Sequence, residues 1–259
     1  MKVTTNGVRI HVEDRGSGDP ALVFLHYYGG SSRTWKYVTP PLAESYRTVA
    51  LDHRGWGESD APAAGYALAD HADDAAGVVA ALGLRRYVLV GHSMGGKVAM
   101  LLASRRPDGL AGLVLVGSSM PTPLVASAET RERMRAAYST RENVEMAIDQ
   151  VLTAKPLGPA DREQVIADSL RGAPPAKQAW PASGSREDIS AAVPAIAVPT
   201  LVIACGLDRV DSVDTTRSEL VPRIPGAVLQ VLPGTGHLSP LESPADLVRL
   251  IDQFAAGLV

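Results

Sequence analysis

The chain has little of three features that would each point to a particular class of protein. It has one cysteine, Cys205, in 259 residues, so no internal disulfide can form and a cysteine-rich metal site is excluded. It has no excess of basic residues, because 25 Lys and Arg stand against 28 Asp and Glu, for a formal net charge of −3. Nucleic-acid binding by bulk electrostatics is therefore not expected.

Long hydrophobic runs are also missing. No stretch approaches the roughly 18 consecutive apolar residues that a membrane-spanning helix needs. Residues 1–7 carry no apolar core of the kind found in secretion signals. We therefore expect a reduced, cytoplasmic protein without membrane contacts. Hydrophobic residues make up 46% of the chain, which is enough for a large core in one α/β domain, with or without an insertion.

One stretch, residues 87–106, is the most informative part of the sequence. An apolar run, residues 87–90, suits a strand that is buried on both faces, and residues 97–103 suit a packed helix that stops before Pro107. Between them lies the pattern G-x-S-x-G, from Gly91 to Gly95. Small residues at both ends allow a sharp turn that exposes the hydroxyl of Ser93, which predicts a nucleophile.

Short apolar segments alternate with helical patterns along the rest of the chain. Predicted strands are the arms of a hairpin in 3–13, then 21–25, 47–51, 87–90, 113–116, 200–205 and 227–232. Predicted helices are a short one in 34–44, 68–82, the helix after Ser93, and 245–254. This alternation predicts an α/β protein with a mostly parallel, eight-stranded sheet flanked by helices.

The middle of the chain differs in composition. From about residue 119 to 194 there is no convincing buried strand, and charged helical segments at 129–138, 142–152 and 160–170 are separated by breaks rich in Pro and Gly. We interpret residues 119–194 as a helical insertion above the carboxyl ends of the strands, where such sheets place their sites. Residues 1–118 and 195–259 then form the core.

A serine nucleophile needs a base, and His237 is the favoured candidate among six histidines. It follows the last strand on a loop of small residues and lies after the serine in the chain, the order expected for this type of turn. Another, His26, follows the strand 21–25. The remaining four are expected to be structural or solvated: His11 in the hairpin, His53 in a loop, His71 on the polar side of a helix, and His92 pointing away from the turn.

The acid that orients the base should follow a strand between Ser93 and His237. Asp208, three residues after Cys205, is nearest the strand end, with Asp211 as a rival and Asp214 as a weaker one. The oxyanion formed on attack needs preorganised donors. The backbone N–H of Met94 is one, and that of Tyr28 is our choice for the other, with Tyr27 as the alternative.

At this point the pattern resembles the α/β-hydrolase superfamily, in the branch of small esterases, lactonases and cofactor-free haloperoxidases. The residues that carry the likeness are residues 91–96, residues 52–59 and the Gly236-His237 segment, and the likeness covers residues 20–118 and 195–257. It implies a triad of Ser93, Asp208 and His237, and a cap that matches residues 119–194. It also implies that no metal or organic cofactor is needed.

The chain departs from that family in two places. Members usually have His-Gly after the third strand, whereas this chain has His26-Tyr27-Tyr28, and many have Gly at the position of Cys205. Aromatic residues could therefore line the pocket: Tyr27, Tyr28, Trp35 and, in the insertion, Trp180. For Trp35 and Trp180, core packing is the equal alternative.

The sequence predicts a hydrolase that acts on a small-molecule ester or lactone. Perhydrolysis and carbon–carbon bond hydrolysis use the same triad and stay open, because they differ in pocket shape and water access. A ligand receptor with slow turnover is a third hypothesis, and a plain interaction module is a fourth. No nucleic-acid or membrane partner is expected, and a homodimer is left open.

Overall fold

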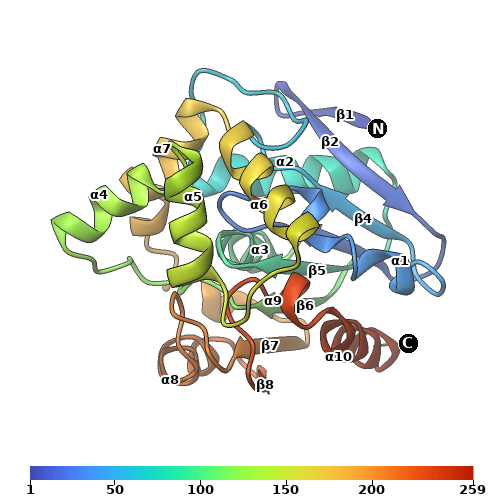
Figure 1. Cartoon of the computed structure of the whole chain (residues 1–259). Helices are drawn as coiled ribbons and strands as arrows, with labels where there is room; N and C mark the ends of the chain where they lie inside the picture. The colour runs from blue at the N-terminus through green and yellow to red at the C-terminus, as the bar shows by residue number, and fades with distance from the viewer. Residues whose placement is uncertain (259) are drawn as a thin grey trace.

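The computed structural model describes residues 1–258 and shows one central sheet covered by helices on both faces (Figure 1). The sheet has eight strands in the order β1-β2-β4-β3-β5-β6-β7-β8. Their bounds are β1 (Lys2–Thr5), β2 (Val8–Arg15), β3 (Ala21–Leu25), β4 (Thr48–Leu51), β5 (Tyr87–His92), β6 (Leu110–Val116), β7 (Thr200–Cys205) and β8 (Val228–Leu232). The predicted mostly parallel, eight-stranded sheet is confirmed.

Only the amino-terminal end of the sheet is antiparallel. β1 and β2 form the predicted hairpin around Asn6-Gly7, and β2 pairs antiparallel with β4. From β4 to β8 every pairing is parallel. Parallel strands bring their carboxyl ends to one edge, so the segments after β3, β5, β6, β7 and β8 emerge on the same side of the molecule.

The helices that follow the strands are unequal in length. They are α1 (Thr39–Leu42), α2 (Leu68–Ala81), α3 (Met94–Ser104), α4 (Ala128–Ala136), α5 (Arg141–Ala147), α6 (Pro159–Arg171), α7 (Pro174–Ala182), α8 (Val213–Thr215), α9 (Ser239–Glu242) and α10 (Pro244–Ala256). Single turns of 3-10 or π geometry are η1 (Ser32–Trp35), η2 (Ile148–Leu152), η3 (Gly184–Arg186), η4 (Val193–Ala195), η5 (Thr216–Leu220) and η6 (Val221–Arg223). No helix within residues 1–258 is both long and apolar enough to cross a bilayer.

The core has one apolar layer on each side of the sheet, and β3 shows how the sequence builds both. All five of its residues are buried. Val23 and Leu25 join the layer that contains residues of α2 and α3, whereas Leu22 and Phe24 join the layer that contains residues of α1 and α10. Because successive side chains of a strand point to opposite faces, a continuous apolar run is required here.

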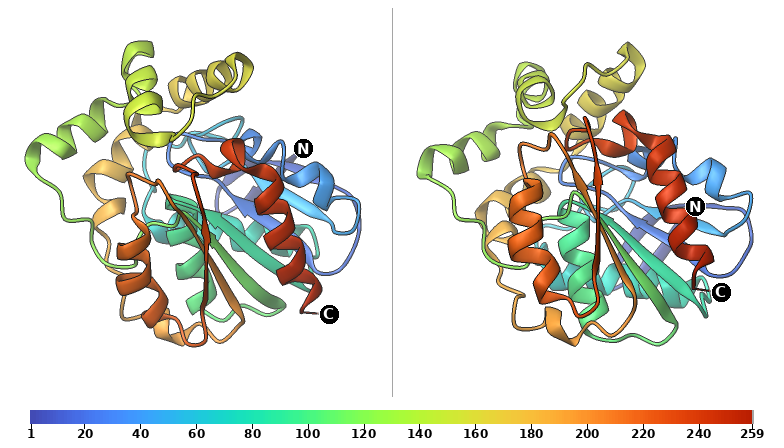
Figure 2. Two further views of the ribbon diagram at one scale, coloured as in Figure 1. Left: turned by 60° about the horizontal axis from the view of Figure 1, so that its bottom comes forward. Right: turned by 90° about the horizontal axis from the view of Figure 1, so that it is seen from below.

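The segment between β6 and β7 contains α4 to α7, and Figure 2 shows these helices gathered at one end of the sheet. A hydrogen bond shows that this segment lies at the carboxyl ends of the strands. The hydroxyl of Tyr138 donates to the carbonyl oxygen of Tyr28, just after β3. A third apolar cluster lies between them and the sheet. Two details differ from the sequence prediction: α7 was not foreseen, and residues 142–152 form α5 followed by the π turn η2 rather than one helix.

Candidate active site

Ser93 occupies a strained turn between β5 and α3. Its backbone has φ 54° and ψ −117°, a conformation that side-chain-bearing residues rarely adopt. The two flanking glycines make the turn sterically feasible. A Cβ on Gly91 would lie 2.4 Å from the carbonyl oxygen of Gly95, and one on Gly95 would lie 2.5 Å from that of Leu25. The sequence pattern G-x-S-x-G is therefore a packing requirement of this turn.

His237 and Asp208 are hydrogen bonded, with 2.8 Å between Nδ1 of the imidazole and Oδ2 of the carboxylate. The other carboxylate oxygen accepts the backbone N–H groups of Val210, at 2.7 Å, and Asp211, at 3.2 Å. Burial favours the neutral acid, but the charge and hydrogen bond of His237 and the two amides hold the pKa of Asp208 below its usual value. Burial acts against the imidazolium, yet Asp208 raises the pKa of His237 above its usual value.

The histidine loop is also tied to the strand that carries the serine. Nε2 of His92, the residue before Ser93, lies 2.8 Å from the carbonyl oxygen of His237. The two rings pack with their centroids 5.1 Å apart. Since Nδ1 of His237 is engaged by Asp208, its Nε2 is the nitrogen left for a reacting group. Ser93 and His237 are almost enclosed, with 6% and 2% of their surface exposed.

The two rival carboxylates lie in different surroundings. Asp211 is buried and its Oδ2 has no hydrogen-bond partner within residues 1–258. Burial raises the pKa of Asp211 to about 7. Asp214 is exposed and pairs with Arg217 at 3.1 Å. Within the described residues, the carboxylate hydrogen bonded to His237 is that of Asp208.

The loop after β3 is held in one conformation by its own polar groups. The carbonyl oxygen of Tyr27 accepts a hydrogen bond from the Gly30 amide, at 3.0 Å, and from Nδ1 of His26, at 2.7 Å. Nε2 of His26 accepts the backbone N–H of His53 at 3.0 Å. The N–H groups of Tyr27 and Tyr28 make no backbone hydrogen bond within residues 1–258, so each can donate to another acceptor. Met94 begins α3 directly after the serine.

Residues 52–59, which carried part of the family likeness, brace this loop. Oδ2 of Asp52 lies 2.9 Å from Nδ1 of His11 and accepts the Glu58 amide at 2.8 Å, while Oδ1 accepts the Ser32 amide at 2.5 Å. Asp52 thus joins β2, the loop after β4 and the start of η1. Next to it, Arg54 and Asp74 form a buried pair with two contacts of 2.6 Å.

The predicted exposure of His71 is wrong. His71 was placed on the polar side of its helix, but it is buried, because His53 and Tyr66 pack against its ring at centroid distances of 5.0 and 6.3 Å. His53 is buried too, with neither ring nitrogen hydrogen bonded within the described chain. Burial lowers the pKa of His71 to about 3, and the charge of Arg54 acts in the same direction. Burial also lowers the pKa of His26 to about 4, although the charge of Asp52 acts in the opposite direction.

The predicted pocket residues separate into two groups. Tyr27, Tyr28 and the half-buried Trp180 belong to the apolar cluster between the sheet and α4–α7, which also contains Met94. Trp35 instead packs against Phe24 in the layer on the α10 face of the sheet and is fully buried. Three further aromatic residues of the first cluster, Trp56, Tyr66 and Tyr138, were not predicted to line the pocket. Trp56 lay inside the 52–59 motif, whereas nothing in the sequence indicated that Tyr138 would lie in this cluster.

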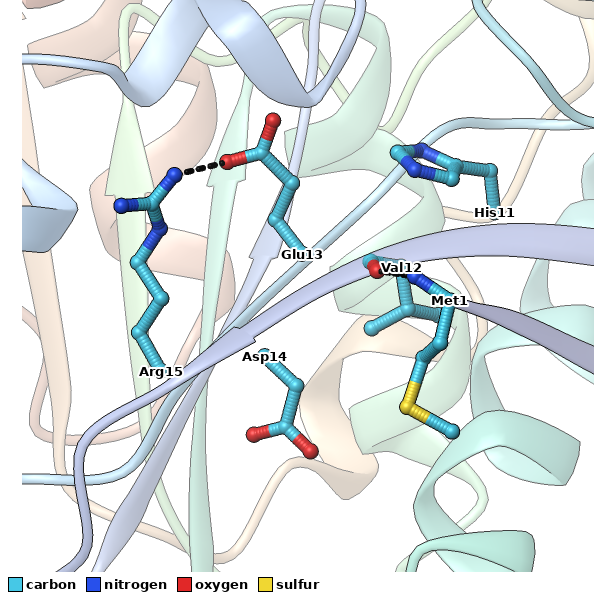
Figure 3. A pocket seen from close by; sticks show the side chains of 6 residues that line it. All are labelled: Met1, His11, Val12, Glu13, Asp14 and Arg15. Carbon is cyan, nitrogen blue, oxygen red and sulfur yellow. Dashed lines mark hydrogen bonds and ion pairs between the residues drawn. The ribbon is translucent and has the colours of Figure 1, made fainter.

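Two hollows of the surface lie away from this site. One has a volume of about 300 Å³ and is bounded by Met1 and residues 11–15. Figure 3 shows its charged rim, in which Glu13 and Arg15 pair at 3.0 Å. The other, of about 280 Å³, lies beside β8 and α10. Neither is lined by Ser93, Asp208 or His237.

Comparisons with known proteins give a matching family model and similar solved structures. A family model described as the alpha/beta hydrolase family matches residues 22–250. The chain is 30% identical over 271 residues to 2-hydroxymuconate semialdehyde hydrolase of Pseudomonas sp. (strain CF600), covering 98% of this chain and 93% of the relative. A solved esterase from Exiguobacterium antarcticum has a TM-score of 0.91 at 24% identity, over 98% of both chains. A solved N-acyl homoserine lactone degrading enzyme has a TM-score of 0.87 at 29% identity, over 98% of this chain and 100% of that one.

The family match spans β3 to α10 and so includes the strained turn, the loop of Asp208 and the loop of His237. Of the relatives at 29% and 30% identity, one is named as a lactone degrading enzyme and the other as a hydrolase. The sheet order, the turn at Ser93 and the family model lead to one conclusion: the chain belongs to the alpha/beta hydrolase family of enzymes.

Proposed function

We propose that the protein is a serine hydrolase that cleaves a carboxylic ester or lactone of a small molecule. The observation that carries this proposal is the hydrogen bond between His237 and Asp208, on a loop that is tied through His92 to the strained turn of Ser93. A hydroxyl, an imidazole and a buried carboxylate are the groups that acyl transfer through serine requires.

In the first half of the proposed reaction, Oγ of Ser93 attacks the carbonyl carbon and its proton passes to Nε2 of His237. Asp208, bound to Nδ1, holds the imidazole in the tautomer that can accept this proton and stabilises the imidazolium that forms. The lowered pKa of Asp208 supports this role, because the carboxylate stays ionised.

The negative charge on the substrate oxygen would be stabilised by the amides of Met94 and Tyr28, with Tyr27 as the alternative to the latter. The carbon–oxygen bond of the ester then breaks, and the leaving oxygen takes the proton from His237. A water molecule, deprotonated by His237, releases the acid from Ser93. In a lactone, the leaving oxygen and the acid belong to the same product molecule.

We assign residues 119–194 as a cap over this site, with residues 1–118 and 195–259 as the core. The support is the apolar cluster that α5 and α6 share with Met94 and Leu238, the neighbours of the serine and the base. Tyr27, Tyr28 and Trp180 would then line the pocket. Such surroundings suit a substrate with an apolar part next to the carbonyl that is attacked.

Hydrolysis of a carbon–carbon bond is the second candidate, because the relative at 30% identity is named for a substrate, 2-hydroxymuconate semialdehyde, that has no ester or lactone group. The same serine, imidazole and carboxylate would act. Product analysis separates the two candidates: an ester or lactone yields an alcohol and an acid, whereas carbon–carbon hydrolysis yields a carbonyl compound and an acid.

The test is the variant Ser93→Ala with a p-nitrophenyl ester of a short acid. We expect turnover to fall by about 10³-fold or more, since removal of a nucleophile leaves only binding and oxyanion stabilisation. A fluorophosphonate probe should add to the wild type at one serine, located by peptide mass spectrometry, and not to the variant.

The matched control is Ser218→Ala, because Ser218 is an exposed serine in the π turn η5, outside the site. Its turnover and labelling should equal those of the wild type. Full activity in Ser93→Ala would refute the proposal, whatever the substrate.

A further inference from the structure

We propose that Tyr138 and Ser169, two residues of the segment between β6 and β7, are positioning residues for the loop that stabilises the oxyanion. This inference rests on the proposed function and adds to it a direct role of the cap segment in the chemical step. It concerns the peptide groups on either side of Tyr28, whose N–H is the proposed second donor.

Tyr138 makes a buried hydrogen bond to the main chain of this loop. Its hydroxyl donates to the carbonyl oxygen of Tyr28 at 2.9 Å, and only 4% of Tyr138 is exposed. Its ring also packs on the ring of Tyr28, with centroids 4.8 Å apart. Burial, followed by the neighbouring Tyr27 and Tyr28, raises the pKa of Tyr138 well above its usual value, so the hydroxyl stays protonated and remains a donor.

The Tyr28 N–H lies in the peptide plane that it shares with the Tyr27 carbonyl, and the peptide plane after Tyr28 holds the same residue from its other side. The plane before it is fixed through the Tyr27 carbonyl, which accepts from His26 and Gly30. The plane after it contains the Tyr28 carbonyl, and the described partner of that oxygen is Tyr138. The core therefore holds the plane that contains the donor, and the cap segment holds the next plane. The Cα of Tyr28 joins the two planes, so the donor is fixed in position only when both are held.

Gly29 shows how closely Tyr138 approaches this backbone. A Cβ on Gly29 would lie 2.5 Å from two ring carbons of Tyr138, and Gly29 has φ +99°, a region that favours glycine. The absence of a side chain at position 29 lets the phenol ring lie against the main chain. This close contact supports a role of Tyr138 in positioning the loop.

Ser169, on α6, holds the next carbonyl of the same loop. Its hydroxyl donates to the carbonyl oxygen of Gly29 at 3.0 Å, and the side chain is fully buried. Two successive carbonyls of the loop are therefore bonded by side chains from two parts of the cap segment. No core side chain within residues 1–258 bonds either of these two oxygens.

The test compares Tyr138→Phe and Ser169→Ala with the wild type by steady-state kinetics on an activated ester. An oxyanion donor acts mainly in the transition state, so a displaced donor should lower kcat and leave KM nearly unchanged. We expect kcat to fall about 10-fold in each variant, less than the loss on deleting a donor outright. Affinity for a trifluoromethyl ketone, which forms the oxyanion on Ser93, should fall in parallel with kcat.

The matched control is Tyr37→Phe. Its hydroxyl donates to Asp161 of α6 at 3.0 Å, so it also joins the core to the cap segment, but on an exposed side chain outside the loop. It should keep both kcat and the affinity for the ketone. A merely structural role of Tyr138 or Ser169 would lower thermal stability without a selective loss of kcat per labelled serine.

The outcomes separate this inference from the proposed function. Normal kcat in folded Tyr138→Phe and Ser169→Ala, together with an inactive Ser93→Ala, would overturn the positioning role alone. If one of the two variants fails to fold, the other decides. An active Ser93→Ala would remove the proposed function itself, and with it the reaction that these residues are proposed to assist.

Discussion

The imidazoles of His26 and His53 lie edge to face, with their ring centroids 4.6 Å apart and an angle of 65° between their planes. His71 packs against His53, with the ring centroids 5.0 Å apart. The three rings form a buried row that begins at the loop after β3. Nε2 of His26 accepts a backbone N–H, which requires that ring to be uncharged. Burial lowers the pKa of His53 and of His71 as well, so the row is a set of neutral imidazoles inside the folded protein.

Acid should destabilise the protein through this row. Burial lowers the pKa of His26 to about 4 and that of His71 to about 3, whereas a histidine in the unfolded chain titrates near 6.5. Because the folded-state pKa is the lower one, this stability is complete above about pH 6.5 and is lost as the pH falls toward 4. We expect the free energy of unfolding to fall by about 1.4 kcal/mol per pH unit for each histidine in this window.

Urea unfolding at a series of pH values measures this slope. In His71→Gln one titrating ring is replaced by an amide that stays neutral. Unfolding should then take up about one proton fewer, so the free energy of unfolding should decline less steeply as the pH falls. A variant with the same slope as the wild type would show that His71 does not carry the effect.

The choice of acid can be tested by comparing Asp208→Asn with Asp211→Asn. An asparagine at position 208 could not stabilise the imidazolium of His237, so kcat for an activated ester should fall by about 10³- to 10⁴-fold. Asp211 does not bond His237, and we expect a loss below about tenfold in its variant. Equal losses at the two positions would contradict the assignment of Asp208.

Asp211→Asn has a second expected effect, on stability. Burial raises the pKa of Asp211 to about 7, above the value near 3.9 of an unfolded aspartate. Its contribution to stability is therefore complete below about pH 4 and is lost as the pH rises through 7. An asparagine stays neutral, so the variant should be more stable than the wild type above pH 7 in a thermal melt, and this advantage should vanish in mild acid.

The turn of Ser93 predicts an intolerance to side chains at Gly95. The added methyl group of Gly95→Ala would lie 2.5 Å from the carbonyl oxygen of Leu25 and 2.7 Å from that of His26, both of them backbone atoms. Forced overpacking of this kind costs about 1–3 kcal/mol, and here it would also move the nucleophile. Gly158→Ala is the control, since the nearest atom to its new Cβ is 4.0 Å away. Thermal melts and ester turnover should show the control unchanged from the wild type.

The buried ion pair of Arg54 and Asp74 allows a double-variant test. Their side chains are 4% and 1% exposed, so Arg54→Leu would leave Asp74 with an uncompensated buried charge. We expect a loss of about 3–5 kcal/mol in the free energy of unfolding, measured in urea. Combining it with Asp74→Leu should recover most of that loss. A double variant no more stable than the single one would show that Arg54 acts through its bond to the Gly65 carbonyl instead.

Features that depend on neighbours in the chain were predictable from the sequence. The apolar run 200–205 is β7, the run 87–90 opens β5, and G-x-S-x-G gives the strained turn, because each follows from local sterics and burial. α7 was missed because Pro174 and Pro175 look like a break. Proline is in fact tolerated in the first turn of a helix, where its missing N–H costs no hydrogen bond.

Features that depend on distant neighbours were not predictable. His71 looks solvated from its own helix, and it is buried only because His53 and Tyr66 return to cover it. Tyr138 looks like the end of a charged helical patch, and its bond to the Tyr28 carbonyl joins residues 110 positions apart. A single sequence does not show which distant residues will be in contact.

The close approach of Gly29 and Tyr138 has a consequence for redesign of this enzyme. The two positions are sterically coupled: any residue with a Cβ at 29 would have to displace the phenol ring, while a smaller side chain at 138 would open a void beside the loop. Library members that add a side chain at 29 and keep the ring at 138, or lose the ring and keep Gly29, should therefore be lost in a screen, and productive ones should change both together.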